Sequence, residues 1–257
     1  MYRIQSTAIV ASLLALPLAH AGTPISDDFD DSVIGSQWSL LEDNPAELSL
    51  IEASGQLGIV ATGSASNTDD AIYLSNGSTG FRLSTADPFS IAIDYELSAF
   101  GDVSSAGDAF GIVFGVGEDL DGQNSAAIGY GVTNIGAGNL VAATVASRTN
   151  DNQTIDAIGG SAPDTGTFVI DYVPGTDTLT LTTGGFSTPL VGLVDGTWSA
   201  DALFVSFGAR GGGFSTQPST AFFDDFRLNS GTVVPIPEPA SLGLLTVACI
   251  ALRRRRG

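Results

Sequence analysis

The chain contains no lysine, and it has only one histidine and one cysteine among its 257 residues. His20 and Cys249 both lie near the ends of the chain, so the long central part contains neither residue. This part therefore cannot form a Ser-His-Asp or Cys-His nucleophile system, a zinc site that uses these ligands, or a disulfide. A lysine Schiff base is excluded as well. Carboxylates, arginines, tyrosines and hydroxyls are the groups that remain for chemistry.

The first 21 residues are typical of a secretory signal peptide. Arg3 supplies a positive charge, and residues 8–18 form a short apolar run. Ala19 and Ala21 place small residues where a signal peptidase requires them. We therefore expect cleavage before Gly22 and export of the rest of the chain.

A proline-rich elbow, a short apolar run and a block of arginines follow one another at the C-terminus. The apolar run, residues 240–252, would span roughly 20 Å as a helix. A bilayer's hydrocarbon core is about 30 Å thick, so this is a short transmembrane helix, with its arginines on the cytoplasmic side. The residues of the proline elbow and of the arginine block that flank the run are Pro237, Glu238, Pro239, Arg253, Arg254, Arg255 and Arg256.

These parts, in this order, resemble the PEP-CTERM sorting signal of Gram-negative bacteria, over residues 234–257. The resemblance implies recognition by an exosortase-type membrane protease near the Pro-Glu-Pro element and removal of the tail. It also implies an inner membrane-anchored precursor and delivery to the cell surface or an exopolysaccharide matrix. A plain C-terminal membrane anchor is the alternative. We therefore divide the chain into a signal peptide (1–21), one domain (22–232) and a sorting signal (233–257).

Without its two ends, the chain is strongly acidic. Only Arg82, Arg148, Arg210 and Arg227 remain as cations, against 27 acidic residues once Glu238 is removed, so the formal charge is near −23. A field of this sign repels nucleic acid and anionic membrane surfaces, and it attracts divalent cations or basic partners. We therefore expect no nucleic-acid partner.

The hydrophobic pattern predicts an all-β fold. Over residues 89–97 apolar and mostly polar residues alternate, the period of a strand with one buried face. Further strands are predicted at residues 38–41, 48–51, 57–61, 71–74, 110–116, 126–132, 140–147, 167–172, 178–181, 203–207 and 222–228. Turn-forming residues separate these runs, and we predict a two-sheet antiparallel β-sandwich. The glycine run at 211–213 lacks a P-loop lysine, and we interpret it as a flexible loop.

Three segments resemble the jelly roll of the concanavalin A-like lectin/glucanase and laminin G-like class. They are Asp27-Asp28-Phe29-Asp30 followed by Trp38, the run over residues 107–114, and the run over residues 222–228. In such folds the first and last strands commonly lie side by side, which would bring Asp27 or Asp28 near Asp224 or Asp225. Because carboxylates repel one another, a cation or Arg227 should then lie nearby. Alternating strand positions that hold these carboxylates apart are the other possibility.

The loop over residues 118–124 places oxygen atoms around a glycine, as a calcium-binding loop does. Asp119, Asp121 and Asn124 are the candidate ligands. The loop lacks the bidentate glutamate that ends an EF-hand loop, so we favour a polar hairpin turn over a calcium site.

Two kinds of carbohydrate chemistry fit the residues present. A glycoside hydrolase needs two carboxylates about 5 to 9.5 Å apart. Asp94 and Glu96 share one face of a strand, but the Glu-x-Asp-x-x-Glu signature of the glucanases of this fold is absent. Carbohydrate binding needs an aromatic platform and a few polar groups. The candidate platforms, for each of which a core position is the commoner outcome, are Trp38, Trp198, Tyr73 and Tyr130.

We therefore predict an exported surface or matrix protein that is not an enzyme and that binds polysaccharide, with calcium as the ion that would assist. No catalytic residue is assigned. A carboxylate-dependent glycoside hydrolase and a passive structural coat protein are the alternatives.

Overall fold

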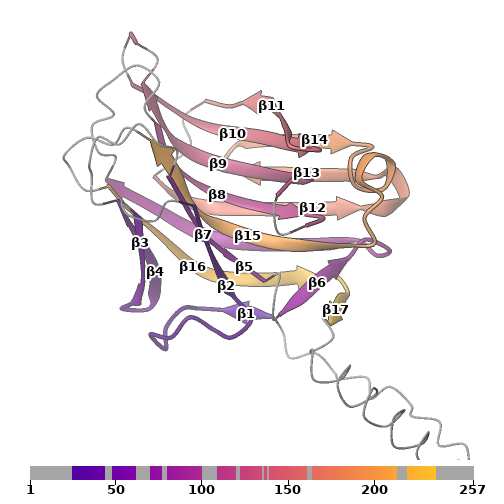
Figure 1. Ribbon diagram of the computed structural model, residues 1–257, viewed down its shortest axis with the longest axis horizontal. Coiled ribbons are helices and arrows are strands. Elements are labelled where there is room, and N and C mark those ends of the chain that lie inside the picture. The colour runs from indigo at the N-terminus through magenta and orange to yellow at the C-terminus, as the bar shows by residue number, and fades with distance from the viewer. Residues whose placement is uncertain are drawn as a thin grey trace, which may run out of the picture.

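The computed structural model shows two antiparallel β-sheets packed face to face (Figure 1). It describes residues 25–43, 48–61, 70–76, 80–99, 109–119, 122–134, 136–137, 139–160, 164–212 and 219–235. The strands in this part are β1 (Ser26–Asp27), β2 (Ser39–Asp43), β3 (Leu48–Ala53), β4 (Gln56–Ala61), β5 (Asp70–Ser75), β6 (Phe81–Ser84), β7 (Phe89–Ala99), β8 (Ala109–Gly117), β9 (Ser125–Asn134), β10 (Asn139–Thr149), β11 (Asn152–Ile158), β12 (Thr165–Val173), β13 (Thr178–Thr183), β14 (Phe186–Val191), β15 (Ala202–Gly212), β16 (Ser219–Ser230) and β17 (Val233–Pro235). The predicted two-sheet antiparallel sandwich is confirmed.

Sheet A has the strand order β14-β13-β12-β7-β16-β4-β3, with β1 beside β16. Sheet B has the order β11-β10-β9-β8-β15-β5-β2, with β6 pairing with β15 and β17 pairing with β6. Ser26 lies opposite Arg227, so the first strand and the long strand near the end of the chain are neighbours, as the jelly-roll resemblance implied. The pairing of β17 with β6 carries the β structure on to Pro235.

Each predicted strand overlaps an observed one, but five observed strands were not predicted. Two of them, β11 and β14, lie at sheet edges, and β11 is exposed along almost its whole length, so it lacks an apolar alternation. The other three, β1, β6 and β17, have only two to four residues each. The interpretation of the glycine run as a loop is wrong for Gly211 and Gly212, which continue β15 opposite Phe110 and Ala109.

The core fills the space between the inner faces of the two sheets. Trp38, just before β2, lies with its ring 4.8 Å from that of Phe207 on β15 and 4.9 Å from that of Phe226 on β16, both edge to face. Such pairs contribute about 0.5–1.5 kcal/mol beyond area burial. Because Phe207 belongs to sheet B and Phe226 to sheet A, this aromatic cluster joins the two sheets.

Several expected features lie outside the described residues and remain predictions. They are the signal peptide with Ala19 and Ala21, and the sorting signal with Pro237, Glu238, Pro239, Arg253, Arg254, Arg255 and Arg256. In the part of the chain that the structure describes, no helix has the length and apolar character needed to cross a membrane.

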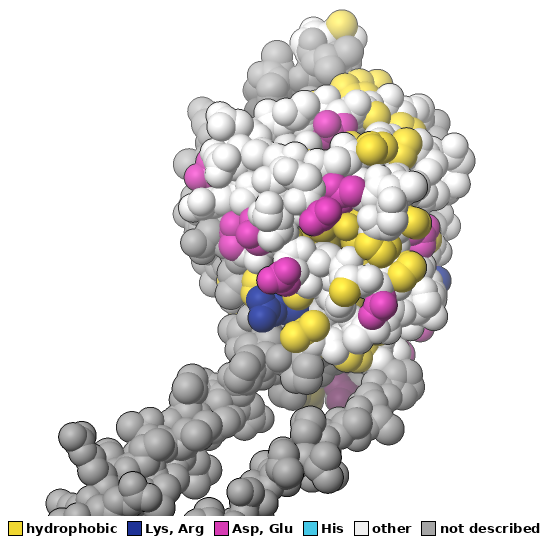
Figure 2. Space-filling model, turned by 90° about the vertical axis from the view of Figure 1, so that its right-hand side faces the viewer, with side chains coloured by type: hydrophobic (Ala, Val, Ile, Leu, Met, Phe, Trp, Pro, Cys, Tyr) yellow, Lys and Arg dark blue, Asp and Glu magenta, His cyan; other side chains and the backbone are white. Residues whose placement is uncertain are grey.

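Acidic side chains are spread over the face of the molecule that Figure 2 shows. On this face Asp and Glu side chains lie among apolar and uncharged polar groups. The acidic character read from the sequence is therefore visible on this face of the folded domain.

Asp177 links the turn that precedes β13 to the turn that follows β14. It follows the 3-10 helix η1 (Pro174–Thr176), and its carboxylate accepts backbone N–H bonds from Val194, Asp195 and Gly196 of the π-helix η2 (Val194–Trp198), at 3.2, 3.0 and 2.9 Å. Burial alone would raise the pKa of Asp177, but the backbone N–H donors and the Tyr172 hydroxyl outweigh it and lower the pKa. Tyr172 is the partner of Asp177 in this hydroxyl–carboxylate contact. Burial of Tyr172 and the negative charge of Asp177 raise the pKa of Tyr172 to about 12.

We expect Asp177→Ala to lower the free energy of unfolding by about 1–3 kcal/mol at neutral pH, because three N–H groups lose their acceptor. Since folding lowers the pKa of Asp177, this contribution is present above the unfolded pKa and is lost as the pH falls through the folded value. The difference from the wild type should therefore shrink below the ordinary pKa of 3.8. Urea unfolding at pH 7 and pH 3 measures both effects.

Asp195→Ala is the matched control, because Asp195 is exposed in the same turn. It should change stability by no more than about 0.5 kcal/mol. A loss for Asp177→Ala that is as large at pH 3 as at pH 7 would contradict the assignment.

Candidate functional site

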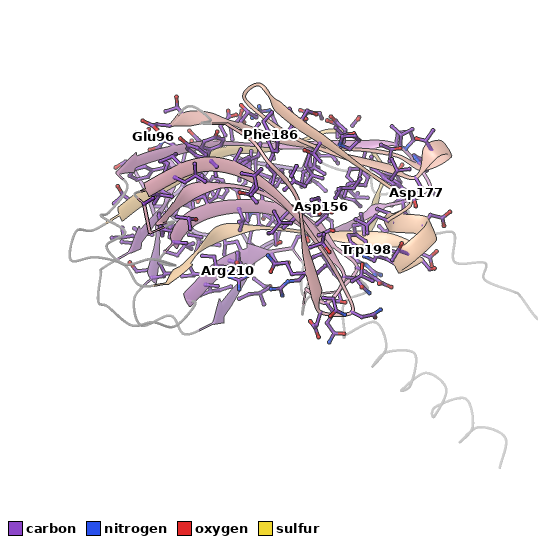
Figure 3. The ribbon with its side chains drawn as sticks, turned by 90° about the horizontal axis from the view of Figure 1, so that it is seen from above. Glu96, Asp156, Asp177, Phe186, Trp198 and Arg210 are labelled. Carbon is purple, nitrogen blue, oxygen red and sulfur yellow. The ribbon has the colours of Figure 1, made fainter. Side chains whose placement is uncertain are left out.

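The outer face of sheet B is hollowed into a groove of about 580 Å³. In the view of Figure 3 the strands of this sheet arch over the side of the molecule on which Arg210 lies. We call this hollow the sheet B groove. Its larger lining side chains are Leu41, Tyr73, Val113, Asp119, Thr144, Arg148, Gln153, Ile155, Phe204, Ser206 and Arg210.

Glycine and alanine form the floor of the sheet B groove. Ala127 on β9 lies opposite Gly115 on β8 and opposite Ala146 on β10. One step further along the strands, Gly129 lies between Val113 and Thr144. Side chains this small leave the space above the strands open, so the hollow follows from the residue types on this face.

The glycines are also required by the close approach of neighbouring strands. A Cβ atom at Gly115 would lie 2.9 Å from the carbonyl oxygen of Ala126, and one at Gly129 would lie 3.1 Å from that of Ile112. A Cβ atom at Gly208 on β15 would collide with the carbonyl oxygen of Ile72. Glycine in a strand commonly marks such a close backbone approach. Gly115 and Gly129, which line the groove, therefore both permit the strand geometry and leave the groove open.

Two aromatic side chains face the groove. Tyr73 on β5 and Phe204 on β15 are both partly exposed lining residues. The guanidinium carbon of Arg82 lies 5.4 Å from the centroid of the Phe204 ring, a cation–π contact. Aromatic faces of this kind offer the apolar surface on which a sugar ring stacks.

Arg148 stands at one end of the groove. It lies opposite Ser125, which lies opposite Gly117, which in turn lies opposite Phe204, so these four residues form one row across the sheet. Its Nη2 donates to Gln153 Oε1 at 3.3 Å, and its backbone oxygen accepts from Trp198 Nε1 at 3.2 Å. The buried indole thus fixes the strand that carries Arg148.

One of the four predicted platforms, Tyr73, lines the groove. Trp38, Trp198 and Tyr130 are 6%, 5% and 2% exposed and belong to the core, whereas Tyr73 lines the groove. Phe204 was missed, although residues 203–207 alternate between buried and partly exposed positions and Arg210 has the same parity as Phe204. That alternation would have placed Phe204 and Arg210 on one outward face, but it does not show that the face is hollow.

The predicted calcium loop is a hairpin between β8 and β9. Asp119 Oδ1 accepts from the Gln123 N–H at 3.0 Å, and the Asn124 side chain donates to Glu118 Oε2 at 2.8 Å and accepts from the Asn150 N–H at 2.9 Å. Asp121 lies outside the described residues. No group of three His, Cys, Asp or Glu residues in the described ranges is placed to hold a metal ion. These contacts match the polar hairpin, and calcium remains a prediction.

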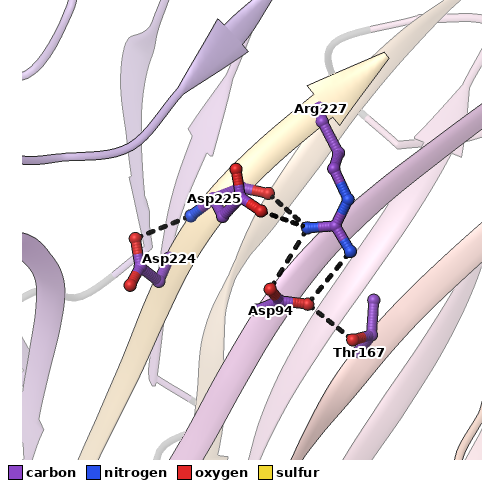
Figure 4. A network of polar contacts seen from close by, with 5 residues as sticks. All are labelled: Asp94, Thr167, Asp224, Asp225 and Arg227. Atoms are coloured by element: carbon purple, nitrogen blue, oxygen red, sulfur yellow. Dashed lines mark hydrogen bonds and ion pairs between the residues drawn. The ribbon is translucent and has the colours of Figure 1, made fainter. Parts of the chain in front are cut away.

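Acidic residues of β16 and β7 meet Arg227 (Figure 4), whereas Asp27 on β1 accepts from Gln37 Nε2 and Trp38 Nε1 at 2.8 and 2.7 Å. Arg227 Nη1 lies 2.8 Å from Asp225 Oδ2 and 3.2 Å from Asp94 Oδ2, and Asp94 also accepts from the Thr167 hydroxyl at 2.5 Å. The pKa of Asp224 is raised, first by burial and then by the nearby charges of Asp225, Asp94 and Asp28. Arg227 therefore balances part of a crowded acidic region.

Asp94 and Glu96 share the outer face of sheet A, as the alternation predicted. Together with Asp224 they line a shallow depression of about 300 Å³. Figure 3 shows Glu96 and Arg210 at opposite sides of the sandwich. The acid pair is therefore remote from the sheet B groove, where Asp119 is the single carboxylate among the described lining residues.

Compared by sequence, the chain matches no protein-family model and no curated protein. Its fold is similar to that of solved structures. A CBM2 module of the evolved Dit of Lactobacillus casei BL23 phage J-1 aligns with a TM-score of 0.51 and 14% identity, over 80% of this chain and 96% of that one. A Bacteroides ovatus GH16 protein of a mixed linkage glucan PUL, in complex with product, aligns with a TM-score of 0.50 and 11% identity, over 79% and 98%. At such low identity the likeness shows the fold alone, and it supports the concanavalin A-like jelly roll.

We expect Gly208→Ala to lower the free energy of unfolding by about 1–3 kcal/mol, because the added methyl group overpacks the β5–β15 pair. Gly160→Ala is the control, since a Cβ atom there meets no atom within 4 Å. Its effect should stay within about 0.5 kcal/mol. Thermal and urea unfolding of both variants provide the measurement, and equal losses would show that the close approach at Gly208 does not matter.

Proposed function

We propose that the protein is an exported, non-enzymatic surface or matrix protein that binds polysaccharide in the sheet B groove. The groove itself carries this proposal. The groove is large enough for several sugar rings, and its floor carries only small side chains. It presents the aromatic side chains of Tyr73 and Phe204. Its polar groups include Thr144, Ser206 and Gln153. Aromatic faces combined with a few polar side chains are the usual elements of a small-molecule binding site.

The fold supports the same conclusion by analogy. The solved structures with TM-scores of 0.50 and 0.51 are, by their descriptions, a GH16 protein in complex with its glucan product and a CBM2 module. Because fold alone does not imply function, the proposal rests on the groove of this chain and not on its similarity to these structures.

Export and sorting rest on the two ends of the sequence. The signal peptide pattern and the resemblance of residues 234–257 to a PEP-CTERM signal support an inner-membrane precursor. An exosortase-type protease would remove its tail and release the domain to the cell surface or to an exopolysaccharide matrix. An exopolysaccharide would then be the natural ligand of the groove.

Binding is favoured over hydrolysis by the distribution of carboxylates. Hydrolysis of a glycosidic bond needs two of them across the sugar, and Asp119 is the single one among the described residues that line the groove. In the described part of the chain, the depression beside Asp94, Glu96 and Asp224 brings together carboxylates from which a hydrolase centre could be built. There, Asp94 is already engaged by Arg227 and Thr167. We therefore keep a glycoside hydrolase as the second candidate.

We expect Ala146→Leu to weaken polysaccharide binding at least about tenfold, because the larger side chain would fill the floor beside Ala127. Isothermal titration with mixed-linkage β-glucan and with alginate, each at matched chain length, measures the loss. Ala86→Leu is the matched control, because Ala86 is exposed and is not a lining residue. It should bind as the wild type does, and circular dichroism and thermal unfolding check that both variants fold.

Three other outcomes would contradict the proposal. If Ala146→Leu binds as tightly as the wild type, the ligand does not occupy the groove. If reducing ends appear and Glu96→Gln abolishes them, the protein is a hydrolase. If no polysaccharide binds and none is cleaved, a passive coat protein is the better description.

A further inference from the structure

We propose that the sheet B groove selects acidic polysaccharides, chains that carry carboxylate or sulfate groups. This inference rests on the proposed function of the groove and deepens it. It is drawn from where the few arginines of this acidic protein lie.

Three of the four arginines between the two ends of the chain are at the groove. Arg148 and Arg210 line it, and Arg82 lies against the ring of Phe204, which also lines it. Among the described lining residues, Asp119 is the one carboxylate, although acids outnumber arginines 27 to four in this part of the sequence. Among the described lining residues the arginines therefore outnumber the carboxylates, and a positive local charge favours an anionic ligand.

The contacts of Arg82 and Arg148 differ from those of Arg227. Arg227, on the outer face of sheet A, contacts two carboxylates, those of Asp94 and Asp225. In the described part of the chain neither Arg82 nor Arg148 contacts a carboxylate, and the Arg148 side chain has one hydrogen bond, to the neutral Gln153. Most of the five N–H donors of the Arg148 guanidinium are thus left for a ligand. A guanidinium matches carboxylates and other planar or tetrahedral oxyanions bidentately.

The positions of the arginines suit a chain rather than a single sugar. Arg148 shares a row across the sheet with Phe204, and Arg210 lies six residues beyond Phe204 on β15. Six residues of a strand extend over roughly 20 Å. A polymer that lies along the groove would meet Arg148 near one end and Arg210 near the other, with the bare glycine and alanine floor between them.

The overall charge of the domain determines the salt concentration at which binding to an acidic polymer should be measured. A body with a formal charge near −23 repels an acidic polymer over long distances. At about 0.15 M salt the Debye length is about 8 Å, so this repulsion is screened while direct contacts to the arginines persist. Binding should therefore be compared at this ionic strength and above it.

The test measures the affinity of the purified protein for oligosaccharides of matched length. Alginate fragments supply carboxylates, carrageenan fragments supply sulfates, and mixed-linkage β-glucan fragments are neutral. We expect at least one acidic ligand to bind about tenfold more tightly than the neutral one, with the two acidic arms showing which group is preferred. Arg148→Gln and Arg210→Gln should each weaken acidic binding about tenfold and change neutral binding less than about twofold.

Arg227→Gln is the matched control, because it removes the same charge from the opposite face of the sandwich, and it should leave all three affinities unchanged. The inference is overturned if neutral and acidic fragments bind equally well, in which case binding blocked by Ala146→Leu would still support the groove. It is also overturned if Ala146→Leu leaves acidic binding intact, because the acid then binds elsewhere. If none of the fragments binds, both the inference and the proposed function are contradicted.

Discussion

The shape of this protein depends on how closely the strands of sheet B approach one another on their outer face. At Gly115 a Cβ atom would lie 2.9 Å from the backbone oxygen of Ala126, and at Gly129 one would lie 3.1 Å from that of Ile112. A sheet can take this geometry only where side chains are absent. The consequence for function is direct, because the residues that permit the close approach are also the ones that leave the outer face hollow.

The rest of the structure holds this sheet in place. The ring of Trp38 contacts those of Phe207 and Phe226, so one aromatic cluster joins sheet B to sheet A. Sheet A in turn is completed by the pairing of β1 with β16, where Arg227 lies among several carboxylates. The two outer faces therefore differ in character. Sheet A presents acidic residues tied to one arginine, and sheet B presents a groove bordered by arginines and aromatic rings.

Much of the fold could be predicted from the sequence, because strand alternation is a local pattern. In the run over residues 89–97 the apolar positions are buried and Ser90, Asp94 and Glu96 are partly exposed, as the alternation indicates, while Ala92 is buried. Edge strands such as β11 could not be found this way, since an edge strand with both faces exposed has no apolar period. The candidate site was more difficult to predict from the sequence than the fold. Of the aromatic residues considered, Tyr73 faces the groove while Trp38, Trp198 and Tyr130 are buried, and residue type alone does not separate these outcomes.

The sequence by itself determined the all-β character, the acidic charge, the lack of histidine, cysteine and lysine chemistry in the central part, and the presence of only four arginines there. Only the tertiary structure decided that Arg148, Phe204 and Arg210 share one face and that this face is hollow. The reason is physical. Alternation sets which side of its own strand a residue occupies, whereas the pairing of β15 with β8, β8 with β9 and β9 with β10 sets which distant residues become neighbours.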